Sequence, residues 1–292
     1  MADEKFFPAT NDVIFKALFV KNQELLKAFL SAALEIPVSE MKVLTIKNAE
    51  MPPVYIDGKL TRLDILLETN EKIINIEMQV AKRDDYKERT LLYWARMYSE
   101  EMKQGKAYNE TGRCICINIL NFGMFDCEDY HSSFSVLEDK RHERLTDRMH
   151  LHFFELTKVP SIKRKNQPDT TDDLRLWMQL FKAKNKEELD MLKSTNVTAI
   201  QESADAILIL NKDKDICNLA KEREEAEMDY YSGLLNAEAK GRAEGEAKGR
   251  AEGKAEGKAE AYAELIADWK AKGMTDEEIQ KLLPANTTFQ VF

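Results

Sequence analysis

The sequence has few cysteines, no long apolar run and no secretory signal. Its four cysteines follow no spacing typical of metal ligands: Cys114, Cys116, Cys127 and Cys217. No apolar run approaches the roughly 20 residues that a membrane-spanning helix needs, and nothing resembles a signal peptide. We therefore expect a cytoplasmic protein with reduced thiols and no membrane contact.

Basic residues are also not in excess. The formal net charge is -9 and the isoelectric point is near 5.2, which argues against a protein that coats nucleic acid nonspecifically. A local basic rim can still lie within an acidic total, so DNA binding is not excluded. With 292 residues, of which 43% are apolar, the chain can form one medium core with an appendage, or two domains.

Residues 60–80 carry the most informative pattern in the chain. Two runs rich in Ile and Leu flank a polar link that contains Asn70 and Glu71, which predicts a β-hairpin. With these two residues as the loop, Asp64 faces Glu77 directly across the strand pair.

The predicted register opposes two carboxylates, and it also sets Arg62 opposite Gln79. Opposed like charges repel, so a further group must neutralise Asp64 and Glu77. A hard divalent cation such as Mg²⁺ does this well, since carboxylates, waters and phosphate oxygens are its usual ligands. Two alternatives to a metal ion are a neighbouring arginine that neutralises the carboxylates and a three-residue loop that shifts the register so that they are not opposed.

These residues resemble a known family. Asp64, followed after twelve residues by Glu77-Met78-Gln79, together with the opening Thr10–Phe19, is similar to the recombination-promoting nuclease family of transposase-like proteins, within the PD-(D/E)xK superfamily. The resemblance covers residues 8–125 closely. It implies an α/β fold, a restriction-endonuclease-like αβββαβ core with a mixed sheet flanked by helices, and a DNA endonuclease that uses Mg²⁺ or Mn²⁺ to hydrolyse phosphodiester bonds.

The resemblance also implies roles for single residues. Asp64 and Glu77 would bind the metal, the Met78 carbonyl would be a third ligand, and Gln79 would position the attacking water. The chain departs from the superfamily pattern at Leu63, where a proline is common, and at Gln79, where a lysine is common. Gln is similar to what the recombination-promoting family shows.

Because Gln79 brings no positive charge to the site, a slow enzyme is one reading of this departure. The alternative function is a catalytically weak or inactive nuclease-fold protein for binding or assembly, which acts through its C-terminal helices. The acidic balance of the chain also favours this alternative.

The first predicted helix begins after Thr10, as N-cap, and runs to about Leu34. Asp12 in its first turn is explained by favourable charge at a helix N-terminus. The family resemblance instead sets this helix beside the metal site, which makes Asp12 and Lys16 candidate substrate-binding residues.

A second predicted helix spans residues 84–104 and has two distinct faces. One face is apolar: Leu91, Leu92, Ala95, Tyr98 and Met102. The other carries Arg89, Tyr93 and Arg96, a spacing suited to contacting a DNA phosphate strand or to pairing with Glu88 and Glu100. The family resemblance favours the DNA contact.

Further strands are predicted at residues 41–46, 112–120, 131–137 and 149–156. His150 and His152 share one side of the last strand, as a zinc pair could, but no cysteine or third histidine is placed to complete four ligands. We expect them to be ordinary edge-strand residues.

Beyond residue 160 the pattern is helical only. Helices are predicted at 172–181, 186–192, 197–210 and 213–235, and residues 238–260 then repeat Gly and Ala every four residues with charges between them. This repeat is either a solvated spacer or a homodimer contact along the small residues. A capping box, Thr275 with Glu278, opens a last helix. We predict three regions: a nuclease-like domain (1–160), a helical module (161–235) and the repeat helix with a C-terminal helical hairpin (236–292).

Overall fold

A computed structural model describes residues 5–41, 44–47, 50–51, 61–62, 65–69, 72–102, 112–162 and 172–283. The predicted loop residues Asn70 and Glu71, and also Asp64, lie outside these ranges. Within them, no helix is both long enough and apolar enough to cross a membrane.

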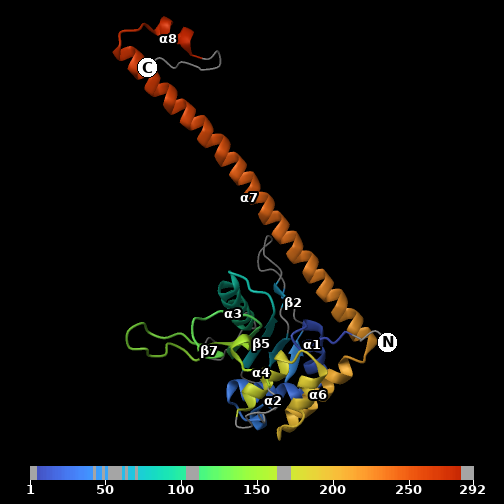
Figure 1. Cartoon of the computed structure of the whole chain (residues 1–292). Helices are drawn as coiled ribbons and strands as arrows, with labels where there is room; N and C mark the ends of the chain where they lie inside the picture. The colour runs from blue at the N-terminus through green and yellow to red at the C-terminus, as the bar shows by residue number, and fades with distance from the viewer. Residues whose placement is uncertain are drawn as a thin grey trace. The chain divides into compact units, whose positions relative to one another are not determined.

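The centre of the fold is a mixed six-stranded sheet (Figure 1). Across the sheet the strands are β1 (Thr45–Lys47), β4 (Ile65–Glu68), β5 (Lys72–Gln79), β6 (Arg113–Leu120), β8 (Met149–Glu155) and β7 (His131–Phe134). Strands β5, β6 and β8 are parallel, while β1 with β4, β4 with β5, and β7 with β8 are antiparallel. A separate ribbon pairs β2 (Glu50–Met51) with β3 (Thr61–Arg62).

The hairpin formed by β4 and β5 has the register expected from the sequence. Ile65 is opposite Ile76 and Glu68 is opposite Ile73, as a loop at residues 70–71 requires. The backbone N–H of Thr69 donates to the Lys72 carbonyl at 2.8 Å and closes the turn. Side chains alternate with period two, so this register decides which residues of β5 face which layer.

One face of the sheet shares its core with α1 (Asp12–Lys21), α2 (Gln23–Leu34) and α4 (Asp173–Lys182), and α6 (Thr198–Leu210) packs against these helices (Figure 1). These helices and the sheet share one large apolar core. The single first helix predicted from the sequence is two helices, because the chain leaves helical geometry at Asn22. The N-cap is Asn11, not Thr10: its side chain accepts from the backbone of Val13 and Ile14.

The opposite face is covered by α3 (Tyr86–Met102). The buried side of α3 is the one that carries Tyr93, and it includes Tyr86, Thr90 and Met97. Leu91 and Leu92 are 47% and 44% exposed, so the face expected to be apolar is turned outward. The sheet face below α3 carries polar groups, and α3 presents hydroxyl-bearing residues to them.

The first three predicted helices after residue 172 are present with nearly the expected bounds, while the fourth, predicted at 213–235, continues to Ala271. They are α4, α5 (Lys186–Leu192), α6 and α7 (Lys214–Ala271). Trp177 and Phe181 of α4 pack against Phe19 and Phe29, so this helical segment shares a core with the sheet. Residues 1–224 form one compact unit. The three predicted regions stay a prediction.

The second unit covers residues 225–292 and contains the rest of α7 and the short α8 (Asp276–Leu282). The Gly and Ala repeat is part of the continuous helix α7. That helix ends in a left-handed Gly273, where the Met274 N–H bonds the Trp269 carbonyl at 3.1 Å. The predicted capping box is confirmed, with the Thr275 N–H donating to Glu278 Oε2 at 2.9 Å.

Candidate functional site

The alternation of β5 separates its side chains into an apolar and a polar set. Ile74, Ile76 and Met78 enter the large core on the α1 side. Asn75 and Glu77 face the α3 side and are buried. A buried carboxylate in a strand requires compensating partners, so this position is costly unless it serves a purpose.

Glu77 is only 3% exposed. Its Oε1 accepts a hydrogen bond from Asn75 Nδ2 at 3.1 Å, two residues away on the same side of β5. Across the parallel pair, Glu77 is in register with Asn118 and Asn75 with Cys116. The Oδ1 atom of Asn75 is buried and has no hydrogen-bond partner within the described part of the chain.

Asn118 links α3 to the sheet through side-chain hydrogen bonds. Its Oδ1 accepts from the Tyr86 hydroxyl at 3.0 Å and from the Thr90 hydroxyl at 3.3 Å. Its Nδ2 donates to the His152 carbonyl at 3.1 Å. Sequence reasoning missed this network and Asn75 alike. The available signal was a single asparagine between two isoleucines in each of two strands.

The two cysteines on this face, Cys114 and Cys116, are buried free thiols. Burial, followed by the nearby Glu77, raises the pKa of Cys116 well above its usual value. Burial and the charge of Glu101 raise the pKa of Cys114 to about 12. Both side chains are therefore protonated thiols at neutral pH.

Gln79 and Met78 end the strand. The Gln79 side chain is half-buried and its Nε2 donates to the Ala81 carbonyl at 3.2 Å. The Met78 side chain points to the apolar core, and its backbone is in register with Ile119. Arg62, predicted to face Gln79, pairs through its backbone with Glu50 in the separate ribbon.

The three predicted phosphate-contacting residues lie on the inner and lateral sides of α3. The guanidinium of Arg89 lies over the ring of Tyr93, 5.0 Å from its centroid, and its Nε donates to the Tyr93 hydroxyl. Tyr93 is buried, while Arg89 and Arg96 are half-buried. Their role in DNA contact stays a prediction.

Asp12 and Lys16 lie on α1, which packs on the face of the sheet opposite to Glu77. The Asp12 carboxylate accepts from Arg223 Nε of α7 at 2.9 Å. Lys16 is half-buried. The described contacts join Asp12 to α7 and do not bring it to the polar face of β5.

A comparison with protein-family models gives one decisive result. The model described as PD-(D/E)XK nuclease family transposase matches residues 9–237. The chain belongs to this family. No curated protein and no solved structure gives a significant match. The match covers the sheet, α3 and all helices up to the middle of α7, so membership supports a nuclease or transposase-like function for the whole first unit.

Members of the PD-(D/E)XK family typically use divalent metals. The donors on the polar face suit a hard cation, because the Glu77 carboxylate and the unpartnered Asn75 carbonyl are both oxygens. Asp64, the other predicted ligand, lies outside the described residues. Among those that are described, no three His, Cys, Asp or Glu side chains form a metal-binding group.

The histidines of β8 differ from expectation in one respect. Strand β7 lies outside β8 and pairs with residues 151–154, so His152 is not at the sheet edge. Strand β7 also brings a third histidine: His131 Nε2 and His152 Nδ1 share a hydrogen bond of 3.1 Å. Burial, then His131 and His150, lower the pKa of His152 to about 4. The pair is therefore neutral at pH 7.

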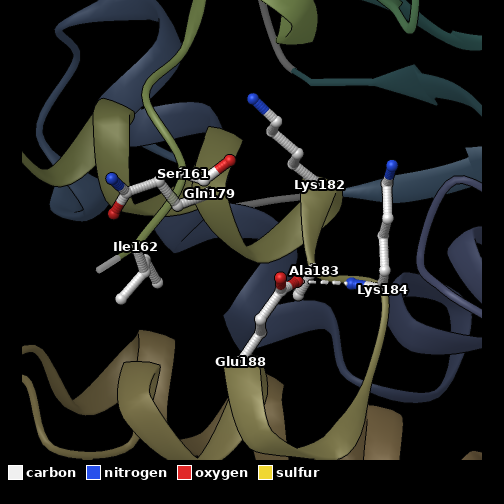
Figure 2. Close-up of a pocket in the computed structure, with 7 residues that line it drawn as sticks. All are labelled: Ser161, Ile162, Gln179, Lys182, Ala183, Lys184 and Glu188. Carbon is white, nitrogen blue, oxygen red and sulfur yellow. Dashed lines mark hydrogen bonds between the residues drawn. The ribbon is translucent and has the colours of Figure 1, made fainter. Parts of the chain in front are cut away.

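A small pocket of about 110 Å³ at α4 and α5 is a weaker candidate (Figure 2). Its Lys182 donates to the Val159 carbonyl, and Glu188 accepts from the Lys184 backbone at 2.7 Å. Figure 2 shows both lysine side chains extending away from Glu188. The polar groups do not converge on one point, and α4 lies on the sheet face opposite to Glu77.

Proposed function

We propose that this protein is a DNA endonuclease of the recombination-promoting, transposase-like type, which hydrolyses phosphodiester bonds with Mg²⁺ or Mn²⁺. The observation that carries the proposal is the buried Glu77 carboxylate on the polar face of β5, within a chain that belongs to the PD-(D/E)XK nuclease family transposases. The register of the β4–β5 hairpin supports it further.

Continuation of that register by one residue would bring Asp64 opposite Glu77. The two carboxylates, with the Met78 carbonyl, would hold the cation. A bound divalent cation stabilises negative charge on a phosphate and makes water a better nucleophile at neutral pH. The protein side chains would bind and orient the reactants. Gln79 would hold the attacking water through its amide. The Asn118 hydrogen bonds keep α3 in place on the sheet face that carries Glu77.

DNA is the proposed partner. Arg89 and Arg96, with Tyr93 beside Arg89, would contact its phosphates from α3. Asp12 and Lys16 remain predicted substrate-binding residues without support from the described contacts, because α1 packs on the other face of the sheet. A homodimer through the C-terminal helices is a separate prediction, which light scattering on the full chain tests.

Cleavage of supercoiled plasmid tests the proposal directly. We expect nicking with Mg²⁺ or Mn²⁺, none with EDTA, and none with Asp64→Ala. Glu68→Gln is the matched control, since Glu68 is a carboxylate at the last position of β4.

Equal cleavage by wild type and Asp64→Ala would reject the enzyme. That result would favour the alternative, a nuclease-fold binding or assembly protein that acts through its C-terminal helices.

A further inference from the structure

Asn75 has no exposed surface and lies between two isoleucines in the middle of β5. A buried amide costs free energy unless both of its ends are hydrogen-bonded. Only the nitrogen end of Asn75 is bonded within the described residues. A polar group in this situation indicates a function beyond packing.

The orientation of the Asn75 amide follows from its neighbour. The Nδ2 end of the amide faces Glu77 and donates to its Oε1 at 3.1 Å. The carbonyl oxygen Oδ1 is then the atom left without a partner. Both side chains are on the same side of β5, and the amide that carries this oxygen is in direct contact with the carboxylate through its Nδ2.

Asn118, on the neighbouring strand, shows what a structural asparagine looks like here. Its Oδ1 accepts two hydrogen bonds and its Nδ2 donates one, and its partners belong to α3 and β8. Asn75 touches no such partners through its Oδ1. Asn118 therefore joins secondary-structure elements, whereas the side-chain oxygen of Asn75 is available to a ligand.

We propose that Asn75 has two parts in divalent-cation binding: its Nδ2 fixes the orientation of the Glu77 carboxylate, and its Oδ1 supplies a further oxygen to the cation. This inference rests on the proposed function. Amide carbonyls are common oxygen ligands of hard cations. A hydrogen bond to one carboxylate oxygen also orients the other, as partners of metal ligands do in general.

Mn²⁺ binding to the full chain tests this without any cleavage, with free Mn²⁺ measured by electron paramagnetic resonance. Asn75→Leu removes both functions at similar volume, and we expect its Kd for Mn²⁺ to rise about 10- to 100-fold. Cys116→Ala is the matched control. Cys116 is in register with Asn75 on the same face but supplies no oxygen, and we expect wild-type affinity.

Asn75→Asp distinguishes a role of Asn75 in metal binding from a purely structural role. It also provides the test if Asn75→Leu does not fold. It keeps an oxygen at the same place but sets a second negative charge beside Glu77. We expect a lower Tm in EDTA and a larger rise of Tm on adding Mn²⁺ than wild type shows. A structural role alone predicts the lower Tm without the larger rise.

The outcomes distinguish this inference from the proposed function. If wild type binds Mn²⁺, Glu77→Gln does not, and Asn75→Leu binds like wild type, the role of Asn75 is rejected while the metal site stands. If wild type binds no Mn²⁺, both are rejected. A Mn²⁺-induced rise of Tm in Asn75→Asp that is no larger than in wild type also overturns the role of Asn75.

Discussion

The two faces of the central sheet are built from different chemistry. Toward α1, α2 and α4, strands β5 and β6 bury isoleucines and Met78, among them Ile76 and Ile117. Toward α3 the same strands present Asn75, Glu77 and Asn118, with cysteines between them. One face can be varied in detail as long as its volume is kept, while the other depends on individual hydrogen bonds.

This contrast indicates how the fold divides its tasks. The apolar face supplies most of the stability, because burial of aliphatic and aromatic side chains is the main favourable term in folding. The polar face carries groups that lower stability unless they are paired. We therefore expect substitutions on the apolar face to change unfolding, and those on the polar face to change metal binding and cleavage more.

The largest expected change is in stability on the apolar face. Ile117→Ala removes a fully buried side chain from the centre of the sheet and should lower the free energy of unfolding by about 2 to 5 kcal/mol. Urea denaturation measures it. Ile117→Val should cost only about 0.5 to 1.5 kcal/mol. Cleavage by the folded fraction should be unchanged for both, and loss of activity at equal folded fraction would break the contrast.

On the polar face, Asn118→Leu should cost about 2 to 3 kcal/mol, because it leaves the buried Tyr86 hydroxyl without its acceptor. Combining it with Tyr86→Phe removes both partners. In a double-mutant cycle by urea denaturation, the double variant should then lose less unfolding free energy than the sum of the losses of the two single variants. Strict additivity would contradict the network.

The histidine pair gives stability a pH dependence. The pKa of His152 is lowered from 6.5 to about 4 in the folded state, so the unfolded chain binds more protons between these values. This contribution is present above pH 6.5 and is lost as the pH falls to about 4. The loss is at most about 3 kcal/mol.

Denaturation of wild type and His152→Asn at pH 7 and pH 4.5 isolates this effect from other titrating groups. The variant keeps a hydrogen-bonding group near His131 but does not titrate, so its stability should fall less over this range. The charges that face the cluster are Glu35 near His131, and Asp147, Arg113 and Arg144 near His150. Equal falls for both proteins would rule out the pair as the source.

The smallest expected change is at Asp12. Asp12→Asn breaks a partly exposed ion pair with Arg223 and should cost less than about 1 kcal/mol in thermal unfolding. Because α1 packs on the apolar face, plasmid cleavage should be unaffected. A clear loss of cleavage without loss of folding would show that Asp12 acts at the site after all.

Much of this arrangement could be predicted from the sequence where the information is local. The period-two alternation and the short polar link gave the correct β4–β5 register, and the capping box of Thr275 with Glu278 was recognised from spacing alone. The family resemblance was carried by a few residues in the right order and is confirmed over residues 9–237.

The remaining features depend on partners far apart in the chain. Tyr86 and Asn118 are 32 residues apart, so their hydrogen bond leaves no periodic signal. The apolar side chains Leu91 and Leu92 predict a buried face of α3, but they are exposed. The sheet below α3 carries polar groups, which favour Tyr86 and Thr90 as the residues that face it. His131 approaches His152 only because β7 adds to the outside of β8.

The central claim is that the polar face of β5 carries metal-dependent cleavage of DNA. The most direct test is the rate of supercoiled plasmid cleavage with Mg²⁺ by Glu77→Gln and by Ile76→Val, adjacent residues on opposite faces of one strand. With both proteins folded, we expect Glu77→Gln to be slower by about 100-fold or more and Ile76→Val to match wild type. Cleavage by Glu77→Gln at the wild-type rate would contradict the claim.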